Sequence, residues 1–199
     1  MDTAIEIIVN DIETDGYSVS NNFISEGEST AFRDEIMRLE ENKSFKHAGI
    51  GNNTNKQTDT KIRSDDIFWL EKDDKTLLFP FFKKMDELVL NLNRSFYLGL
   101  NDSEYHLAHY PTGGFYKKHS DAFKSDDDRK MSVILYLNHN WKQDDGGELV
   151  LYLKNSEKTT QPLSGRLVIF ESHLEHEVLE SNTDRYSVTG WLKSKVLAF

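Results

Sequence analysis

Two periodicities divide the chain into regions of different character. In the first half, apolar side chains recur every three or four positions, which is the spacing of one face of an α-helix. From Glu104 onward, short runs rich in apolar and β-branched residues are separated by turn-forming residues, which is typical of strands. The pattern therefore predicts helices in the N-terminal half and a sheet in the C-terminal half.

Three amphipathic helices are predicted in the first half. A capping box at Thr3-x-x-Glu6 is expected to start the first helix, and Ser29 or Thr30 is expected to cap the second. Pro80 is tolerated only in a first turn, so the third helix should begin between Lys75 and Leu78. The apolar positions are Ile5, Ile8 and Ile12 in the first helix, Phe32, Ile36 and Leu39 in the second, and Leu77, Leu78, Phe81, Phe82, Met85, Leu88, Val89 and Leu92 in the third.

Seven short strands are predicted after the helices. They cover residues 104–110, 115–120, 131–137, 148–153, 166–170, 175–179 and 186–192. Many short strands at close spacing indicate a sandwich or a barrel. We therefore expect an α+β fold in which helices from about residues 1–100 pack on one face of a jelly roll formed by about residues 101–195. The length of 199 residues corresponds to one domain, residues 1–199.

The composition restricts the classes of partner. The chain has 24 Lys and Arg against 34 Asp and Glu, a net charge of −10 that repels nucleic-acid phosphates. No apolar run is long enough for a bilayer, and residues 1–6 lack the basic start of a signal peptide. We therefore expect a cytoplasmic protein with neither nucleic acid nor a membrane as partner. Because the chain has no Cys, a bound metal would need His and carboxylate ligands.

The triplet His119-Ser120-Asp121 is the first candidate for metal binding. Residues two apart on a strand point to the same face, so an imidazole and a carboxylate could occupy adjacent positions on one metal. A second His from another strand would complete the set of two His and one carboxylate that holds Fe(II) and leaves open positions. His176 opens a predicted strand and is our choice, with His173 as the competing residue. The remaining strand histidines, among them His106, are expected to be core-edge residues.

A candidate anion-binding residue follows at a fixed interval. Arg185 lies nine residues after His176 and opens another predicted strand, and strands at that separation can lie side by side. The guanidinium is the group best shaped to hold a carboxylate through two parallel hydrogen bonds. Thr189 and Trp191 would share the face of Arg185. The alternative interpretation is a strand end with a solvated arginine.

The order and content of several segments resemble a known family. The sequence is similar to 2-oxoglutarate- and Fe(II)-dependent dioxygenases of the prolyl 4-hydroxylase type, most closely the hypoxia-inducible-factor prolyl hydroxylases and their bacterial relatives. The segments that carry the resemblance are residues 62–71, 110–121, 135–141, 146–149, 176–178 and 185–191. The resemblance implies a double-stranded β-helix, that is, a jelly roll.

The resemblance also implies a role for individual residues. It assigns the metal ligands to His119, Asp121 and His176, and the binding of 2-oxoglutarate to Arg185, Tyr136, Tyr110, Thr189 and Trp191. It assigns contacts with the substrate to Arg129, Arg63 and Tyr116. The spacings from Tyr110 to His119 and from Phe170 to His176 are slightly shorter than in the animal enzymes, which bears on peptide specificity more than on the chemistry.

The activity implied is hydroxylation at C4 of a prolyl residue in a protein substrate. Fe(II), 2-oxoglutarate and O₂ would be required, succinate and CO₂ would be released, and ascorbate is a further candidate cofactor. We expect a monomer that binds a proline-containing protein or peptide. Two alternatives stay open, namely an oxygenase of the same fold acting on a free amino acid or small metabolite, and a non-catalytic jelly-roll interaction module. The polar loops at residues 49–60 and 122–128 favour a peptide groove over a closed pocket.

Overall fold

The computed structural model describes residues 3–42, 44–48, 61–71, 77–122 and 128–195. In this part of the chain there are three α-helices, α1 (Thr3–Asp15), α2 (Glu26–Glu41) and α3 (Phe79–Phe96), and one 3₁₀ turn, η1 (Gln143–Asp145). The eleven strands within the same ranges are β1 (Tyr17–Ser20), β2 (Lys46–His47), β3 (Asp66–Leu70), β4 (Asp102–Tyr110), β5 (Tyr116–His119), β6 (Arg129–Tyr136), β7 (Leu149–Tyr152), β8 (Glu157–Thr160), β9 (Leu167–Glu171), β10 (Glu175–Val178) and β11 (Arg185–Lys193). The predicted loop at residues 49–60 and residues 123–127 of the second predicted loop lie outside the described residues.

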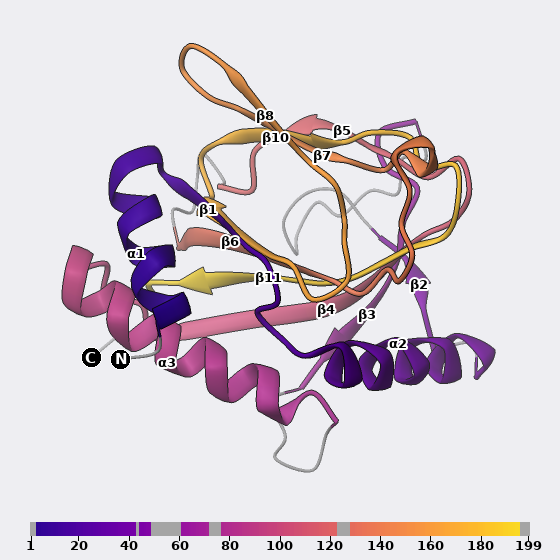
Figure 1. Cartoon of the computed structure of the whole chain (residues 1–199), viewed down its shortest axis with the longest axis horizontal. Helices are drawn as coiled ribbons and strands as arrows, with labels where there is room; N and C mark the ends of the chain where they lie inside the picture. The colour runs from indigo at the N-terminus through magenta and orange to yellow at the C-terminus, as the bar shows by residue number, and fades with distance from the viewer. Residues whose placement is uncertain (1–2, 43, 49–60, 72–76, 123–127, 196–199) are drawn as a thin grey trace.

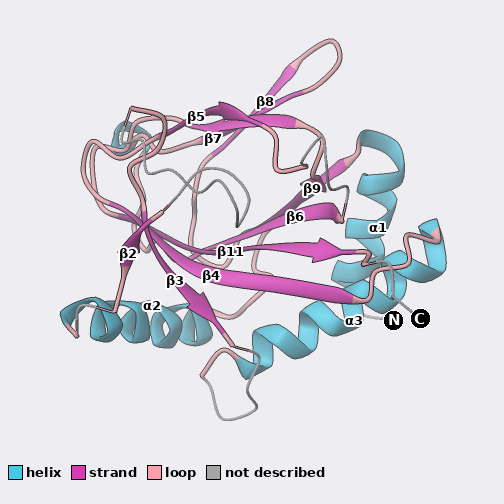
Figure 2. Cartoon of the chain, turned by 180° about the vertical axis from the view of Figure 1, so that it is seen from behind, coloured by secondary structure: helices cyan, strands magenta, loops and turns pink. Residues whose placement is uncertain are grey.

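The strands form two antiparallel sheets that face each other. The described strands pair in the order β1-β9-β6-β11-β4-β3-β2 in a larger sheet and β5-β10-β7-β8 in a smaller one. Figure 1 shows the smaller sheet above the larger one, with α2 and α3 below, and Figure 2 shows the same layers from behind. This arrangement of helices on one face of a two-sheet roll confirms the predicted α+β jelly roll.

Each face of the larger sheet borders a separate apolar core. Along β4, Tyr105 and Leu107 pack toward the helices with residues of α1, α2 and α3. Ala108 and Tyr110 point the other way and pack against side chains of the smaller sheet, such as Leu149. The alternation of a strand therefore places one set of residues in a structural core and the other set between the two sheets, where the candidate ligands lie.

Helices α1 and α3 are present where they were predicted, but their starts differ and the start of α2 needs a correction. Thr3 is the first residue of α1 rather than its cap, and α3 begins at Phe79, so that Leu77 lies before it and is exposed. The N-cap of α2 is Ser25, whose hydroxyl accepts from the backbone N–H of Glu28 while the Glu28 carboxylate accepts from the Ser25 N–H. The prediction of Ser29 or Thr30 was wrong by about one turn, because Ser25 and Glu28 form the capping box. Ser29 is inside the helix, where its hydroxyl bonds to the Ser164 hydroxyl at 2.5 Å.

All seven predicted strands are present, and four further strands were missed. β1, β2 and β3 precede residue 101 and join the larger sheet, and β8 forms the edge of the smaller one. β1 has the polar sequence Tyr-Ser-Val-Ser and is held by pairing with β9, which lies about 150 residues later. A local pattern cannot reveal a strand that depends on such a distant partner. Among the described residues, no helix is long and apolar enough to cross a membrane.

Candidate active site

Three predicted ligands meet at one point between the sheets. His119 ends β5, His176 lies directly opposite it on β10, and Asp121 follows β5 by two residues. One ligand atom from each of these residues lies within 4.8 Å of the others. Nε2 of His119 is 3.7 Å from one carboxylate oxygen of Asp121, and Nε2 of His176 is 3.6 Å from the other. The structure places His176 in this group and leaves the side chain of His173 exposed.

Hydrogen bonds on the far side of each ligand fix its orientation. Nδ1 of His119 donates to the Lys117 carbonyl at 2.7 Å, and Nδ1 of His176 donates to the Leu174 carbonyl at 3.0 Å. The Asp121 carboxylate accepts from the Ser132 hydroxyl at 2.7 Å. With both Nδ1 atoms donating to carbonyls, each Nε2 carries a lone pair that points toward the shared centre. This donor set fits a divalent transition metal with open coordination positions.

The electrostatics of the group favour the protonation states that a metal needs. Burial, followed by the neighbouring His176, lowers the pKa of His119 to about 4, so this imidazole is neutral at pH 7. Burial acts to raise the pKa of Asp121, but His176, His119 and the Ser132 hydroxyl outweigh it and hold that pKa below its ordinary value. A neutral imidazole beside an ionised carboxylate is the state in which both can donate electron pairs to a cation.

A buried arginine lies on the facing sheet at the start of β11. The Arg185 side chain is 1% exposed, and its Nε donates to the Gly147 carbonyl at 2.9 Å. Its guanidinium carbon is 4.9 Å from the ring centroid of Tyr110 and 5.0 Å from that of Tyr136. Arg185 Nη2 and the Tyr136 hydroxyl are both buried, and neither has a hydrogen-bond partner among the described residues. Because a buried cation without a counter-charge is costly, this pocket fits the carboxylate of a ligand.

The relative position of His176 and Arg185 corrects one sequence expectation. β10 belongs to the smaller sheet and β11 to the larger, so the two strands do not lie side by side. They face each other across the space between the sheets. The nine-residue interval therefore allows the chain to cross from one sheet to the other, which places His176 and Arg185 in facing sheets.

The inner face of β11 continues the wall from Arg185. Thr189 pairs with His106 of β4, and its hydroxyl is 3.3 Å from that of Ser187. Trp191 lies next along this face, and its buried indole N–H has no hydrogen-bond partner among the described residues. The Trp191 ring is 5.4 Å from the His106 ring and 6.2 Å from Trp69. Thr189 and Trp191 thus share the face of Arg185, as the alternation of the strand predicts.

The three predicted substrate contacts surround the ligands. Tyr116 stacks on His119 with ring centroids 3.5 Å apart, and the Arg63 guanidinium lies 4.3 Å from the Tyr116 centroid. The Arg129 guanidinium lies 3.5 Å from the Trp191 centroid and donates to Glu104. The structure thus brings all three residues to the site, with both arginines already paired to acids.

Two residues of the site were given no role by the sequence reasoning. The first is Ser132, a strand residue whose hydroxyl donates to Asp121. Nothing in the sequence near Ser132 indicates that contact, because it depends on how the strands are arranged. Gly147 is the other, with a φ of +65°, and a Cβ there would lie 3.1 Å from the Arg185 Cδ and 2.9 Å from the Ser181 hydroxyl. The signal for Gly147 was its place in residues 146–149, one of the segments that carry the family resemblance, but no role was assigned to it.

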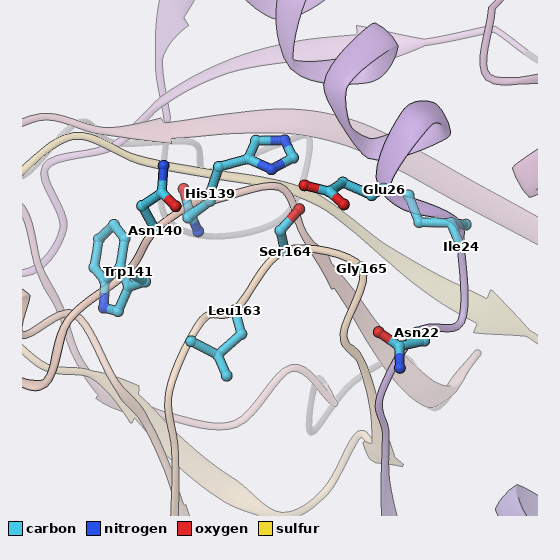
Figure 3. A pocket seen from close by; sticks show the side chains of 10 residues that line it. Asn22, Ile24, Glu26, His139, Asn140, Trp141, Leu163, Ser164 and Gly165 are labelled. Atoms are coloured by element: carbon cyan, nitrogen blue, oxygen red, sulfur yellow. The ribbon is translucent and has the colours of Figure 1, made fainter.

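A separate cavity of about 310 Å³ lies near the start of α2 (Figure 3). Its lining residues are Asn22, Ile24, Glu26, Asn138, His139, Asn140, Trp141, Leu163, Ser164 and Gly165. The Asn138 amide bonds to the Pro162 and Tyr186 carbonyls, and the Ser164 hydroxyl bonds to Ser29. This cavity shares no lining residue with the group of ligands or with the arginine pocket.

Comparisons with known proteins agree with this geometry. The profile of the 2OG-Fe(II) oxygenase superfamily matches residues 105–193, a range that includes His119, Asp121, His176 and Arg185. A curated PKHD-type hydroxylase of Prochlorococcus marinus (strain MIT 9215) is 37% identical over 83 residues. That match covers 41% of this chain and only 37% of the length of the relative.

Two solved structures are similar over almost the whole chain. A prolyl-4-hydroxylase of Pseudomonas putida is 34% identical, with a TM-score of 0.88 over 96% of this chain and 100% of that one. A prolyl hydroxylase of Trichoplax adhaerens, solved in complex with a peptide fragment of the hypoxia inducible factor oxygen degradation domain, is 29% identical, with a TM-score of 0.88 over 96% and 89%. With 34% identity over the full length of a solved relative, and with its ligand group and buried arginine in place, the chain belongs to the 2OG-Fe(II) oxygenase superfamily.

Proposed function

We propose that this protein is a dioxygenase that hydroxylates C4 of a prolyl residue in a protein or peptide, using Fe(II), 2-oxoglutarate and O₂. The observation that carries the proposal is the placement of two imidazoles and a carboxylate opposite a buried arginine that has no anionic partner among the described residues. The similarity to two solved prolyl hydroxylases supports the prolyl substrate. When bound, Fe(II) and 2-oxoglutarate supply the oxidising chemistry, in which O₂ is consumed, succinate and CO₂ leave, and one oxygen atom enters a C–H bond.

The protein residues hold the metal and keep part of its coordination sphere open. His119, Asp121 and His176 would supply one ligand atom each, all from one side. The carbonyls of Lys117 and Leu174 hold the two rings, and the Ser132 hydroxyl holds the carboxylate. Three protein ligands leave positions for a chelating cosubstrate and for O₂.

Arg185 and the tyrosines would bind the cosubstrate. The far carboxylate of 2-oxoglutarate would accept from Arg185 Nη2 and from the Tyr136 hydroxyl, two of the buried polar atoms that have no hydrogen-bond partner among the described residues. Tyr110, next to the guanidinium, would contact the keto-acid end. Thr189 and Trp191 would line the pocket between Arg185 and the metal. Arg185, Tyr136 and Tyr110 are all buried, so solvent has little access to this end of the pocket.

The proposed substrate is a prolyl residue in a peptide or protein. A peptide substrate is supported by the Trichoplax adhaerens relative, which is bound to one. Contacts of the peptide with Arg63, Arg129 and Tyr116 stay predictions, as does a requirement for ascorbate. The alternative of a non-catalytic module would leave the charge of Arg185 without a function, and we do not adopt it. A small-metabolite substrate is left as an outcome of the test.

Mass spectrometry of the host proteome tests the proposal. Extracts from cells with and without this protein are compared for prolyl residues that have gained one oxygen atom. We expect at least one protein to carry the modification only when the protein is present, and to lose it in an Asp121→Ala strain. Purified protein with the candidate peptide, Fe(II) and 2-oxoglutarate should form succinate and hydroxyprolyl peptide in equal amounts. If only free amino acids or small metabolites stimulate succinate formation, the substrate is a small molecule and the peptide proposal is wrong.

A further inference from the structure

His119 is part of a stack of three side chains, with Tyr116 and Arg63. Its ring centroid lies 3.5 Å from that of Tyr116, and the His176 ring lies 4.2 Å away with its plane tilted by 54°. The planes of His119 and Tyr116 are only 15° apart, so the two rings are nearly parallel. The guanidinium of Arg63 covers the Tyr116 ring at 4.3 Å. The stack therefore runs from a ring between the sheets to an arginine.

The outer end of the stack is held by a buried ion pair. Nε and Nη2 of Arg63 donate to the two carboxylate oxygens of Asp65 at 2.7 Å and 2.6 Å. The Asp65 side chain is fully buried and that of Arg63 is 12% exposed. Burial disfavours the charge of Arg63, but Asp65 outweighs this effect and raises the pKa of Arg63. The planar fork of arginine is thus fixed in position by a bidentate bond.

The backbone reinforces the same contact. β5 lies at the edge of the smaller sheet, and residues 62–64 pair with its free side. The Lys117 N–H donates to the Ile62 carbonyl at 2.9 Å, and the Phe115 N–H donates to the Ser64 hydroxyl at 2.9 Å. Both edges of the strand that carries His119 are therefore bonded to neighbouring chain segments.

We infer that Asp65, Arg63 and Tyr116 form a support that holds the His119 imidazole in its metal-binding orientation. The Nδ1 bond to the Lys117 carbonyl leaves the ring free to rock about that bond, and a parallel ring against its face removes this freedom. Groups behind a metal ligand commonly change metal affinity 10- to 100-fold when they are altered. Arg63 is then a positioning residue for the metal centre, a role distinct from contact with the peptide. The inference rests on the metal site of the proposed function.

Metal affinity measured without cosubstrate or peptide tests the inference. Mn(II) binding to the apo-protein is followed by electron paramagnetic resonance of the free ion, and folding is followed by circular dichroism. Arg63→Lys keeps the charge but loses the flat fork, and we expect its Mn(II) dissociation constant to rise about 10-fold. Tyr116→Phe keeps the ring and should bind within about twofold of wild type, whereas Tyr116→Leu should bind as weakly as Arg63→Lys.

Arg33→Lys is the matched control. The Arg33 guanidinium lies 5.1 Å from the centroid of Tyr186, on the helix side of the larger sheet, and this tyrosine contacts none of the three ligands. We expect its Mn(II) affinity to equal that of wild type. An unchanged affinity in Arg63→Lys, with only the KM for peptide raised, would overturn the inference, and so would an equal loss in Arg33→Lys. A wild-type protein that binds no Mn(II) would instead refute the metal centre itself.

Discussion

At the scale of single residues, Arg185 is the sharpest test of the cosubstrate pocket. Replacing it with lysine removes the two parallel hydrogen bonds that a guanidinium can make with a carboxylate. Loss of such a buried pair costs about 2–5 kcal/mol, so the concentration of 2-oxoglutarate required should rise roughly 30-fold to several thousand-fold. Titration of succinate formation against 2-oxoglutarate measures the effect. Mn(II) affinity, measured as a control, should be unchanged. If the concentration of 2-oxoglutarate required is also unchanged, Arg185 does not bind the cosubstrate.

A second residue makes the stability of the fold depend on pH. His106 is 3% exposed, and burial, followed by Arg63, lowers its pKa to about 4. Between pH 6.5 and pH 4 the unfolded chain binds a proton at this histidine and the folded chain does not, so the free energy of unfolding falls as the pH falls.

We expect this loss to be about 3 kcal/mol over that range for His106 alone. In His106→Gln the side chain cannot titrate, so the difference in unfolding free energy between variant and wild type should shrink as the pH is lowered from 7 to 4. Urea denaturation at both pH values measures it. Other groups titrate in both proteins and cancel in the comparison. Parallel curves for the two proteins would contradict a neutral buried His106.

At the scale of elements, the N-cap of α2 can be tested by substitution, because two different N-caps have been assigned to this helix. The pattern placed the cap at Ser29 or Thr30, and the structure places it at Ser25. Ser25→Ala should lower the free energy of unfolding by about 1 kcal/mol, because the backbone N–H of Glu28 loses its acceptor and the Glu28 carboxylate loses the Ser25 hydroxyl as a donor. Thr30→Ala is the control and should change stability by less than about 0.5 kcal/mol. Chemical denaturation of both variants measures the free energy of unfolding. A larger decrease in Thr30→Ala than in Ser25→Ala would contradict the assignment of Ser25 as the N-cap.

At the scale of the whole molecule, the candidate site joins the two sheets. His119 and His176 come from the smaller sheet, and Arg185 and Tyr136 come from the larger one. A ligand that binds both walls should stabilise the complete fold. At ligand concentrations about 100 times the dissociation constant, Mn(II) with 2-oxoglutarate should add about 2.7 kcal/mol to the free energy of unfolding. Asp121→Ala should show little of this gain, and an equal gain in that variant would argue against a shared site.

Periodicity and residue chemistry were enough to predict much of this protein. Local periodicity predicted the apolar stripe of α3, the seven later strands and the packing of helices on one side of a jelly roll. It could do so because an element that buries one face repeats its apolar residues every three or four positions in a helix and every two in a strand. The spacing of His119 and Asp121 and the resemblance to a family predicted that these residues and His176 lie together, and the structure places them together. Their role as metal ligands stays a prediction. The treatment of residues 1–199 as one domain stays a prediction.

Tertiary structure decided everything that depends on partners distant in the chain. β1, with the polar sequence Tyr-Ser-Val-Ser, is a strand because β9 pairs with it. β3 is rich in β-prone residues, but only its pairing with β4 places it in the larger sheet. β10 and β11 lie in facing sheets although the chain connecting them is short. Arg63 is stacked on Tyr116, which in turn stacks on His119, a contact between distant segments that no spacing in the sequence predicts. Such contacts follow from how sheets close on each other, which is a property of the whole chain and cannot be determined from any segment of it.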